Sequence, residues 1–236
     1  MLDAPEWLAV TAQEATSDPW VALVDIIIHI PRVLERSDKL SREGASADAF
    51  TTIITDSELI VARGREWLNM YENDRPRYTK VDVRTINGFL DTICDDLTFE
   101  TVFNFDSWTA SMVYLAYWMS MLILQSNAFL LVRKYRTLQP KELLLWNHEL
   151  AGYADCICRG VPFSCRPEAG YTGRITTLTP LVVARKYFDA KGAKDEIAWC
   201  EKAYYGTKVP GLYTPPVPIQ PSKGFREFVQ RSENYV

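Results

Sequence analysis

The segment SWTASMVYLAYWMSMLILQSNAFLLV, residues 107–132, contains no charged side chain. About 20 apolar residues are enough to cross a lipid bilayer. This segment, however, places serine, threonine, glutamine and asparagine on more than one face of a helix. Lipid gains nothing from such groups, whereas a helix enclosed by other helices can use them for internal hydrogen bonds. We therefore expect an all-α fold built around a buried apolar helix, and no membrane as a partner.

Length and composition indicate an ordinary globular protein. The chain has 236 residues, of which 47% are hydrophobic and 24% are charged. This suffices for a large core, and no linker rich in glycine, serine or proline divides the sequence. We expect a single helical domain over residues 1–236, with an irregular proline-rich tail over about residues 207–236.

Charge and cysteine content exclude several classes of function. The formal net charge is −4, and there is no basic stripe of the kind that neutralises DNA phosphates. The five cysteines fit no zinc module, so reduced thiols are expected. The amino terminus lacks the basic start and long apolar stretch of a signal peptide. We expect an intracellular protein with no direct nucleic-acid contact, no bound metal and no cofactor.

Apolar spacing and capping residues predict six to eight helices along the chain. One begins at Ser17 or Asp18 with Pro19 in its first turn, and Pro31 should kink or split it. Further helices are expected over the following ranges: 44–74, 140–160 with Gly160 as its end, 179–191 before Gly192, and 194–205 before Gly206. Residues 78–100 are ambiguous between a short strand and a helix. Residues 165–180, rich in glycine and proline, are expected to form a loop.

The apolar segment also supplies candidate ligand-binding residues. Methionine and aromatic side chains on a helix suit the wall of an apolar pocket, with a few polar groups for orientation. The candidates are Tyr117, Trp118, Met119, Gln125 and Asn127. Ordinary core packing is the alternative for each of them.

Four residues are candidates for acid–base chemistry. His148 and Asp155 lie on one expected helix, where a histidine and a carboxylate can form a general base. Tyr114 and Asp95 are the other two. Asp95 belongs to DTICDDLTFE, residues 91–100, which resembles the metal-binding aspartates of class I terpene cyclases but lacks a complete second motif. No nucleophile elbow, phosphate loop or H-E-x-x-H motif is present, which disfavours standard hydrolases and nucleotide enzymes.

Several stretches, taken in order, resemble one known family. They are PEWLAV (5–10), DPWVALVDIIIHIPRVLERSDKL (18–40), SWTASMVYLAYWMSMLILQ (107–125), ADCICRGVPFSCRPEAGYTGRITTLTPLVVARKYF (154–188) and AKDEIAWCEKAYYG (193–206). Together they are similar to the fungal-specific transcription-factor domain that follows a binuclear zinc-cluster DNA-binding module. The matching positions, which we interpret as mostly structural, are Tyr117, Trp118, Cys158, Pro162, Gly170, Gly173, Pro180 and Trp199.

The resemblance implies an all-helical regulatory domain that responds to small molecules. The six-cysteine basic segment of the family is missing, so DNA recognition does not carry over. We expect a freestanding module that binds a small apolar molecule or a protein partner, namely a full-length regulator or a second copy of itself, in the nucleus. The alternative is a cytoplasmic, cofactor-independent cyclase or isomerase that acts on an apolar intermediate of fungal secondary metabolism. A fragment of a longer regulator is a third hypothesis.

Overall fold

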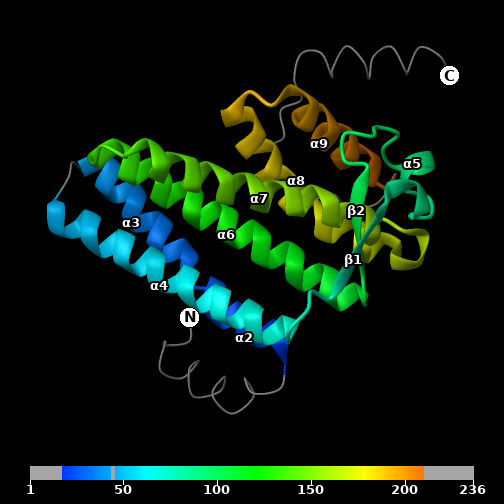
Figure 1. Ribbon diagram of the computed structural model, residues 1–236, viewed down its shortest axis with the longest axis horizontal. Helices are drawn as coiled ribbons and strands as arrows, with labels where there is room; N and C mark the ends of the chain where they lie inside the picture. Colours follow the sequence, from blue (N-terminus) through cyan, green and yellow to red (C-terminus); the bar gives the residue numbers. More distant parts are fainter. Residues whose placement is uncertain (1–17, 44–45, 210–236) are drawn as a thin grey trace. The chain divides into compact units, whose positions relative to one another are not determined.

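The computed structural model describes residues 18–43 and 46–209, and helices make up most of it (Figure 1). The predicted all-α fold class is confirmed, with a small two-stranded sheet added to it. The chain forms two compact units. Unit 1 comprises Met1–Arg77 and Ala116–Tyr153, and unit 2 comprises Tyr78–Leu115 and Ala154–Val236. The single domain over residues 1–236 stays a prediction, and residues 210–236 of the expected tail lie outside the described residues.

The described part of unit 1 begins with three helices whose ends follow from local sequence. They are α2 (Pro19–Ile27), α3 (Ile30–Glu43) and α4 (Ala47–Glu72). Asp18 caps α2 by accepting a hydrogen bond from the backbone N–H of Trp20. The split expected near Pro31 is confirmed, because α2 ends at Ile27 and α3 begins at Ile30 with Pro31 in its first turn. Both α2 and α3 pack against α4.

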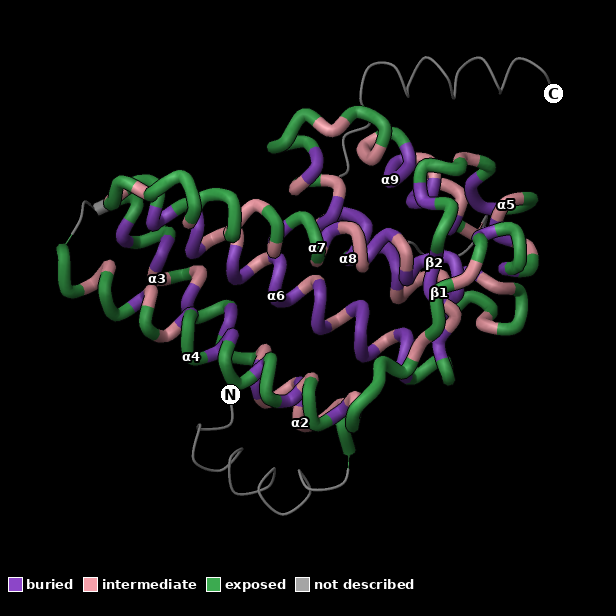
Figure 2. Tube along the Cα trace, viewed as in Figure 1, coloured by how far each residue is buried: buried purple, intermediate pink, exposed green. Residues whose placement is uncertain are grey.

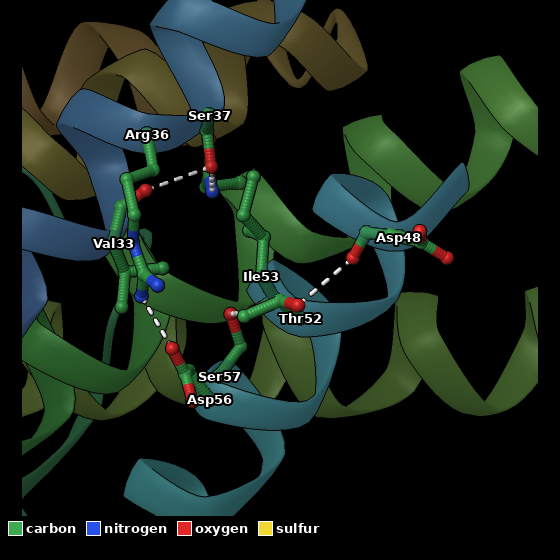
Figure 3. A network of polar contacts seen from close by, with 9 residues as sticks. Val33, Arg36, Ser37, Asp48, Thr52, Ile53, Asp56 and Ser57 are labelled. Atoms are coloured by element: carbon green, nitrogen blue, oxygen red, sulfur yellow. Dashed lines mark hydrogen bonds and ion pairs between the residues drawn. The ribbon is translucent and has the colours of Figure 1, made fainter. Parts of the chain in front are cut away.

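Helix α4 matches the helix expected over residues 44–74. Ser46 caps its start, and Asn73 ends it in the left-handed conformation with φ 44°. An ion pair also joins α3 to α4 (Figure 3). The Arg36 guanidinium lies 2.5 Å from the Asp56 carboxylate, and both side chains are partly exposed.

Helix α6 (Trp108–Tyr135) contains the uncharged segment, and α7 (Pro140–Ser164) follows it. By length and composition alone α6 could cross a bilayer, yet 67% of its most apolar window is buried within the protein. Figure 2 shows burial along most of its length. Its carboxyl-terminal part, from residue 116, belongs to unit 1 together with α7 up to residue 153. The prediction of a buried apolar helix is confirmed.

Unit 2 contains a two-stranded antiparallel sheet that the sequence predicts only in part. Strand β1 (Tyr78–Asp82) pairs antiparallel with β2 (Thr101–Phe105), with Tyr78 opposite Phe105. The strand alternative is therefore correct for the start of residues 78–100. A helix through the rest of that stretch is wrong: α5 (Phe89–Thr92) is short, and the Asp96 carboxylate then accepts hydrogen bonds from Thr98 to form a turn.

The carboxyl-terminal helices correct two further expectations. Helix α7 runs through Gly160 to Ser164 with Pro162 in its last turns. Of the loop expected over residues 165–180, residues 165–169 connect the two helices, whereas residues 170–180 belong to α8 (Gly170–Lys191). Packing explains the difference, because a side chain at Gly173 would lie 2.3 Å from the Ser164 carbonyl oxygen. That glycine thus allows close contact between helices instead of making a turn.

Helices α8 and α9 (Lys194–Thr207) form the pair that closes unit 2. Gly192 ends α8 with φ 68°, as predicted. The Arg185 guanidinium on α8 donates two hydrogen bonds, of 2.9 and 2.7 Å, to the Glu201 carboxylate on α9. Glu201 is fully buried, and so is Trp199, whose ring lies 4.8 Å from that of Phe99. The α8–α9 pair therefore combines an apolar core with a buried ion pair.

Candidate functional site

A cavity of about 470 Å³ lies between α4, α6 and α7, and all of its lining residues belong to unit 1. Helix α4 contributes Phe50, Ile54, Ser57, Val61 and Arg65. These positions are three or four residues apart, so they lie on one face of the helix. Helix α4 thus provides the apolar side chains of Phe50, Ile54 and Val61 along the cavity and a guanidinium at one end, and Ser57 and Glu58 add two polar groups to the same wall.

Helices α6 and α7 complete the wall. Ala128 and Val132 on α6 are buried, and Trp146 on α7 is half-buried. Trp146 also packs on Phe129, with 5.8 Å between ring centroids. Apolar and aromatic side chains from three helices therefore line part of the cavity wall, as in pockets for small organic molecules.

A polar cluster occupies the Arg65 end of the cavity. Oxygen Oε1 of Glu149 accepts hydrogen bonds from Arg65, from the Gln125 amide at 3.0 Å and from the Tyr153 hydroxyl at 3.0 Å. The same Gln125 amide lies 3.2 Å from the Tyr153 oxygen. Three helices thus place their polar groups on one carboxylate oxygen, and we call these four residues the Glu149 cluster.

The contacts within the Glu149 cluster explain the pKa shifts of its carboxyl and phenol groups. Burial disfavours the Glu149 carboxylate, but the hydrogen bonds from Arg65 and Gln125 outweigh it and hold the pKa of this carboxyl below its ordinary value. Burial and the neighbouring Glu149 charge raise the pKa of Tyr153 to about 12. Burial, followed by the neighbouring Tyr153, also raises the pKa of Tyr117. Near neutral pH the cluster therefore holds an ionised carboxylate and protonated phenols.

The other end of the cavity carries an ion pair. A guanidinium nitrogen of Arg136 lies 2.6 Å from the Glu142 carboxylate. The second oxygen of Glu142 accepts a hydrogen bond of 2.9 Å from the backbone N–H of Gln139, just before α7. This carboxylate thus helps to satisfy the helix start as well as closing the cavity.

Among the predicted ligand-binding residues, Gln125 is the one that lines the cavity. Tyr117 packs on Tyr153 of the Glu149 cluster, with 6.3 Å between the two ring centroids. Asn127 instead donates a hydrogen bond of 2.8 Å to the Ser37 hydroxyl, which joins α6 to α3. Trp118 is buried and Met119 half-buried, and neither lines the cavity. A ligand role for these four residues stays a prediction.

The four candidates for acid–base chemistry do not line the cavity either. His148 is exposed on α7 within unit 1. In unit 2, Asp155 pairs with Arg159 at 2.6 Å, and Asp95 lies 3.6 Å from the Lys202 ammonium. Tyr114 is buried in unit 2 beside Tyr78 and Phe105. Residues 18–43 and 46–209 contain no group of three or more histidine, cysteine or carboxylate side chains arranged to hold a metal ion.

Arg65, Glu149 and Tyr153 were not predicted from the sequence. Charged residues on amphipathic helices resemble a solvated face, so Arg65 and Glu149 carry little signal on their own. The four-residue spacing of Glu149 and Tyr153 places them on one face of α7 and is the signal that could have identified them.

No protein-family model matches the chain, and neither the curated proteins nor the solved structures include a significant match.

Proposed function

We propose that the protein is a helical module that binds a small apolar molecule in the cavity of unit 1 and that it is a relative of the regulatory domain of fungal zinc-cluster regulators. The observation that carries the ligand proposal is the cavity of about 470 Å³, with apolar and aromatic side chains in its wall and a polar cluster at one end. Apolar walls provide affinity, and a few polar groups fix the orientation of a ligand. The family relationship is supported by the ordered sequence motifs alone.

The pKa shifts of Glu149 and Tyr153 favour ligand binding over catalysis as the role of the Glu149 cluster. A general acid or base is most effective when its pKa lies near the working pH. The pKa of Glu149 is lowered and that of Tyr153 is raised to about 12, so both move away from neutrality. The Glu149 cluster therefore offers no tuned acid–base pair for the cyclase or isomerase alternative.

Ligand binding can be tested by incubating the purified protein with an extract of cellular metabolites and identifying the retained compounds by mass spectrometry. The wild-type protein should retain an apolar compound. The variant Ala128→Trp should lose it, because the indole would fill space between α4 and α7. A matched change outside the cavity, Ala190→Trp at an exposed position of α8, should retain the compound. Equal retention by both variants would contradict the proposal.

A second candidate function is docking of a protein partner with an acidic and apolar surface. Leu143, Leu144 and Leu145 are consecutive exposed leucines at the start of α7. Leu143 also borders a hollow of about 480 Å³ next to Arg133 and Lys134. These two cations stack on aromatic rings and make no ion pair among the described residues. Exposed apolar side chains beside unpaired cations suit an amphipathic acidic segment of a regulator.

This docking surface can be tested with a fluorescently labelled acidic amphipathic peptide. Binding measured by polarisation should weaken with added salt and in the double variant Leu144→Ser with Leu145→Ser. The exposed Leu59 and Met70 on α4 offer a control pair of serine substitutions that should leave binding unchanged. Insensitivity to both salt and the leucine changes would remove this candidate.

A further inference from the structure

We infer that the ligand of the cavity carries a hydrogen-bond donor, a hydroxyl or an amine, at one end of its apolar skeleton. This inference rests on the proposed ligand-binding function and specifies its chemistry. It is carried by two acceptor oxygens of the Glu149 cluster that receive no hydrogen bond from the described part of the chain.

The first acceptor is the side-chain carbonyl oxygen of Gln125. Only 3% of this residue is exposed, and it lines the cavity. Its amide nitrogen already donates to Glu149 at 3.0 Å and to Tyr153 at 3.2 Å. Its oxygen accepts no hydrogen bond from residues 18–43 or 46–209. Two side-chain atoms in this part of the chain are fully buried without a partner, and the Gln125 oxygen is not one of them, so part of its surface is exposed. The oxygen is therefore reachable from the cavity and has capacity for a donor.

The second acceptor is oxygen Oε2 of Glu149. All three donors in the cluster use Oε1 of this carboxylate. The lowered pKa of the carboxyl keeps it ionised near neutral pH, so Oε2 is an anionic acceptor. Hydrogen bonds to a charged acceptor are stronger than those between neutral groups. A donor on the ligand would therefore meet both an amide oxygen and a carboxylate oxygen at this end.

An acceptor-only or anionic ligand group fits this end less well. Arg65 is the cation of the Glu149 cluster, and its guanidinium is already paired with Glu149. A ligand carboxylate would approach two acceptor oxygens, which leaves both without a donor and adds repulsion from Glu149. The surrounding wall of Val61, Ala128 and Trp146 suits a compact, ring-containing skeleton.

The inference can be tested with three naphthalene probes of similar size. These are 2-naphthol, which donates a hydrogen bond, 2-methoxynaphthalene, which only accepts one, and 2-naphthoate, which is an anion. In calorimetric titrations, 2-naphthol should bind at least about tenfold more tightly than either other probe, because they leave buried acceptors unpaired. Quenching of Trp146 emission, isolated by comparison with Trp146→Phe, would locate the bound probe.

A variant separates the donor preference from binding itself. Gln125→Met keeps the length of the side chain and removes its oxygen, so it should reduce the preference for 2-naphthol over 2-methoxynaphthalene by about threefold or more, and the preference that remains is due to Oε2 of Glu149. Gln139→Met makes the same change at an exposed residue outside the cavity and should keep the full preference. Urea unfolding of each variant would confirm that it is folded.

The probe titrations distinguish failure of the donor inference from failure of ligand binding as a whole. Equal or tighter binding of 2-methoxynaphthalene by the wild-type protein would overturn the donor inference while leaving apolar ligand binding in place. Tight binding of 2-naphthoate would likewise overturn it and would indicate an anion site at Arg65. If no probe binds to the wild-type protein or changes Trp146 emission, both the proposed function and this inference fail.

Discussion

Gly206 in the last turn of α9 offers a direct test of the packing in unit 2. A β-carbon added to Gly206 would lie 1.9 Å from the carbonyl oxygen of Ile93 and 2.7 Å from its carbonyl carbon. The ordinary contact distance begins near 3.4 Å, and both atoms belong to the backbone, so no rotamer change can relieve the clash. Either α9 or the segment after α5 must move by more than an ångström.

The expected loss combines two opposing terms. Overpacking of a tight interior costs about 1–3 kcal/mol, and a clash with backbone belongs at the upper end of that range. Alanine recovers up to about 1 kcal/mol relative to glycine in a helix. Gly206→Ala should therefore lower the free energy of unfolding by about 2 kcal/mol. Urea denaturation followed by far-UV circular dichroism would measure it.

A control with the opposite sign is available on α7. A β-carbon at Gly152 would meet no atom within 4 Å, so Gly152→Ala should stabilise the protein by up to about 1 kcal/mol through helix propensity alone. If Gly206→Ala left the urea midpoint unchanged or raised it, the close approach of α9 to Ile93 would be refuted.

Three further predictions concern charge and thiols. Glu201→Gln removes the buried carboxylate that accepts two hydrogen bonds from Arg185 and should cost about 3–5 kcal/mol in urea unfolding, whereas Arg185→Met combined with Glu201→Leu should recover most of that loss. The pKa of Glu149 is lowered in the folded state, so its contribution to stability is present above about pH 4.5 and is lost as the pH falls through the folded-state pKa; Glu149→Gln should therefore reduce the fall in melting temperature in acid. Burial raises the pKa of three cysteine thiols to about 12, so an aromatic disulfide reagent near pH 8 should label them slowly in the native protein and completely in urea. These thiols are Cys94, Cys156 and Cys165.

Helix starts and ends were predictable where a capping residue or a left-handed residue determines them. Asp18 and Ser46 cap the helices that follow them, and Asn73 and Gly192 end helices in left-handed conformations. Each of these residues acts through its own backbone or through hydrogen bonds within one turn. A single sequence contains that information in full.

Residues 165–180 show where prediction of secondary structure from local sequence fails. Glycine and proline are typical of loops, yet Gly173 and Pro180 lie buried within α8. Gly173 serves the contact with Ser164 at the end of α7, which no local pattern indicates. Pro180 is tolerated despite its missing N–H and its usual cost in a helix interior. Tertiary packing thus determines the helix against the local preference.

Of the four residues in the Glu149 cluster, Gln125 alone was predictable from the sequence, for a physical reason. Gln125 stands out because it is a polar residue within an apolar helix. Arg65, Glu149 and Tyr153 lie on helices with many polar residues, where nothing distinguishes them until α4, α6 and α7 pack together.

The polar residues of α6 also explain how so apolar a helix finds defined neighbours. Apolar side chains pack with little directional preference, so they do not by themselves determine which helix lies on which face. Ser111 pairs with the Ser164 hydroxyl in unit 2, while in unit 1 Gln125 bonds to Glu149 and Asn127 to Ser37. A wrong pairing would bury these groups without partners, which costs about 1–3 kcal/mol for each. Gln125 therefore positions α7 with its amide nitrogen and leaves its oxygen free to accept the hydrogen bond of the proposed ligand, so the side chain that specifies the packing also contributes a polar group to the cavity.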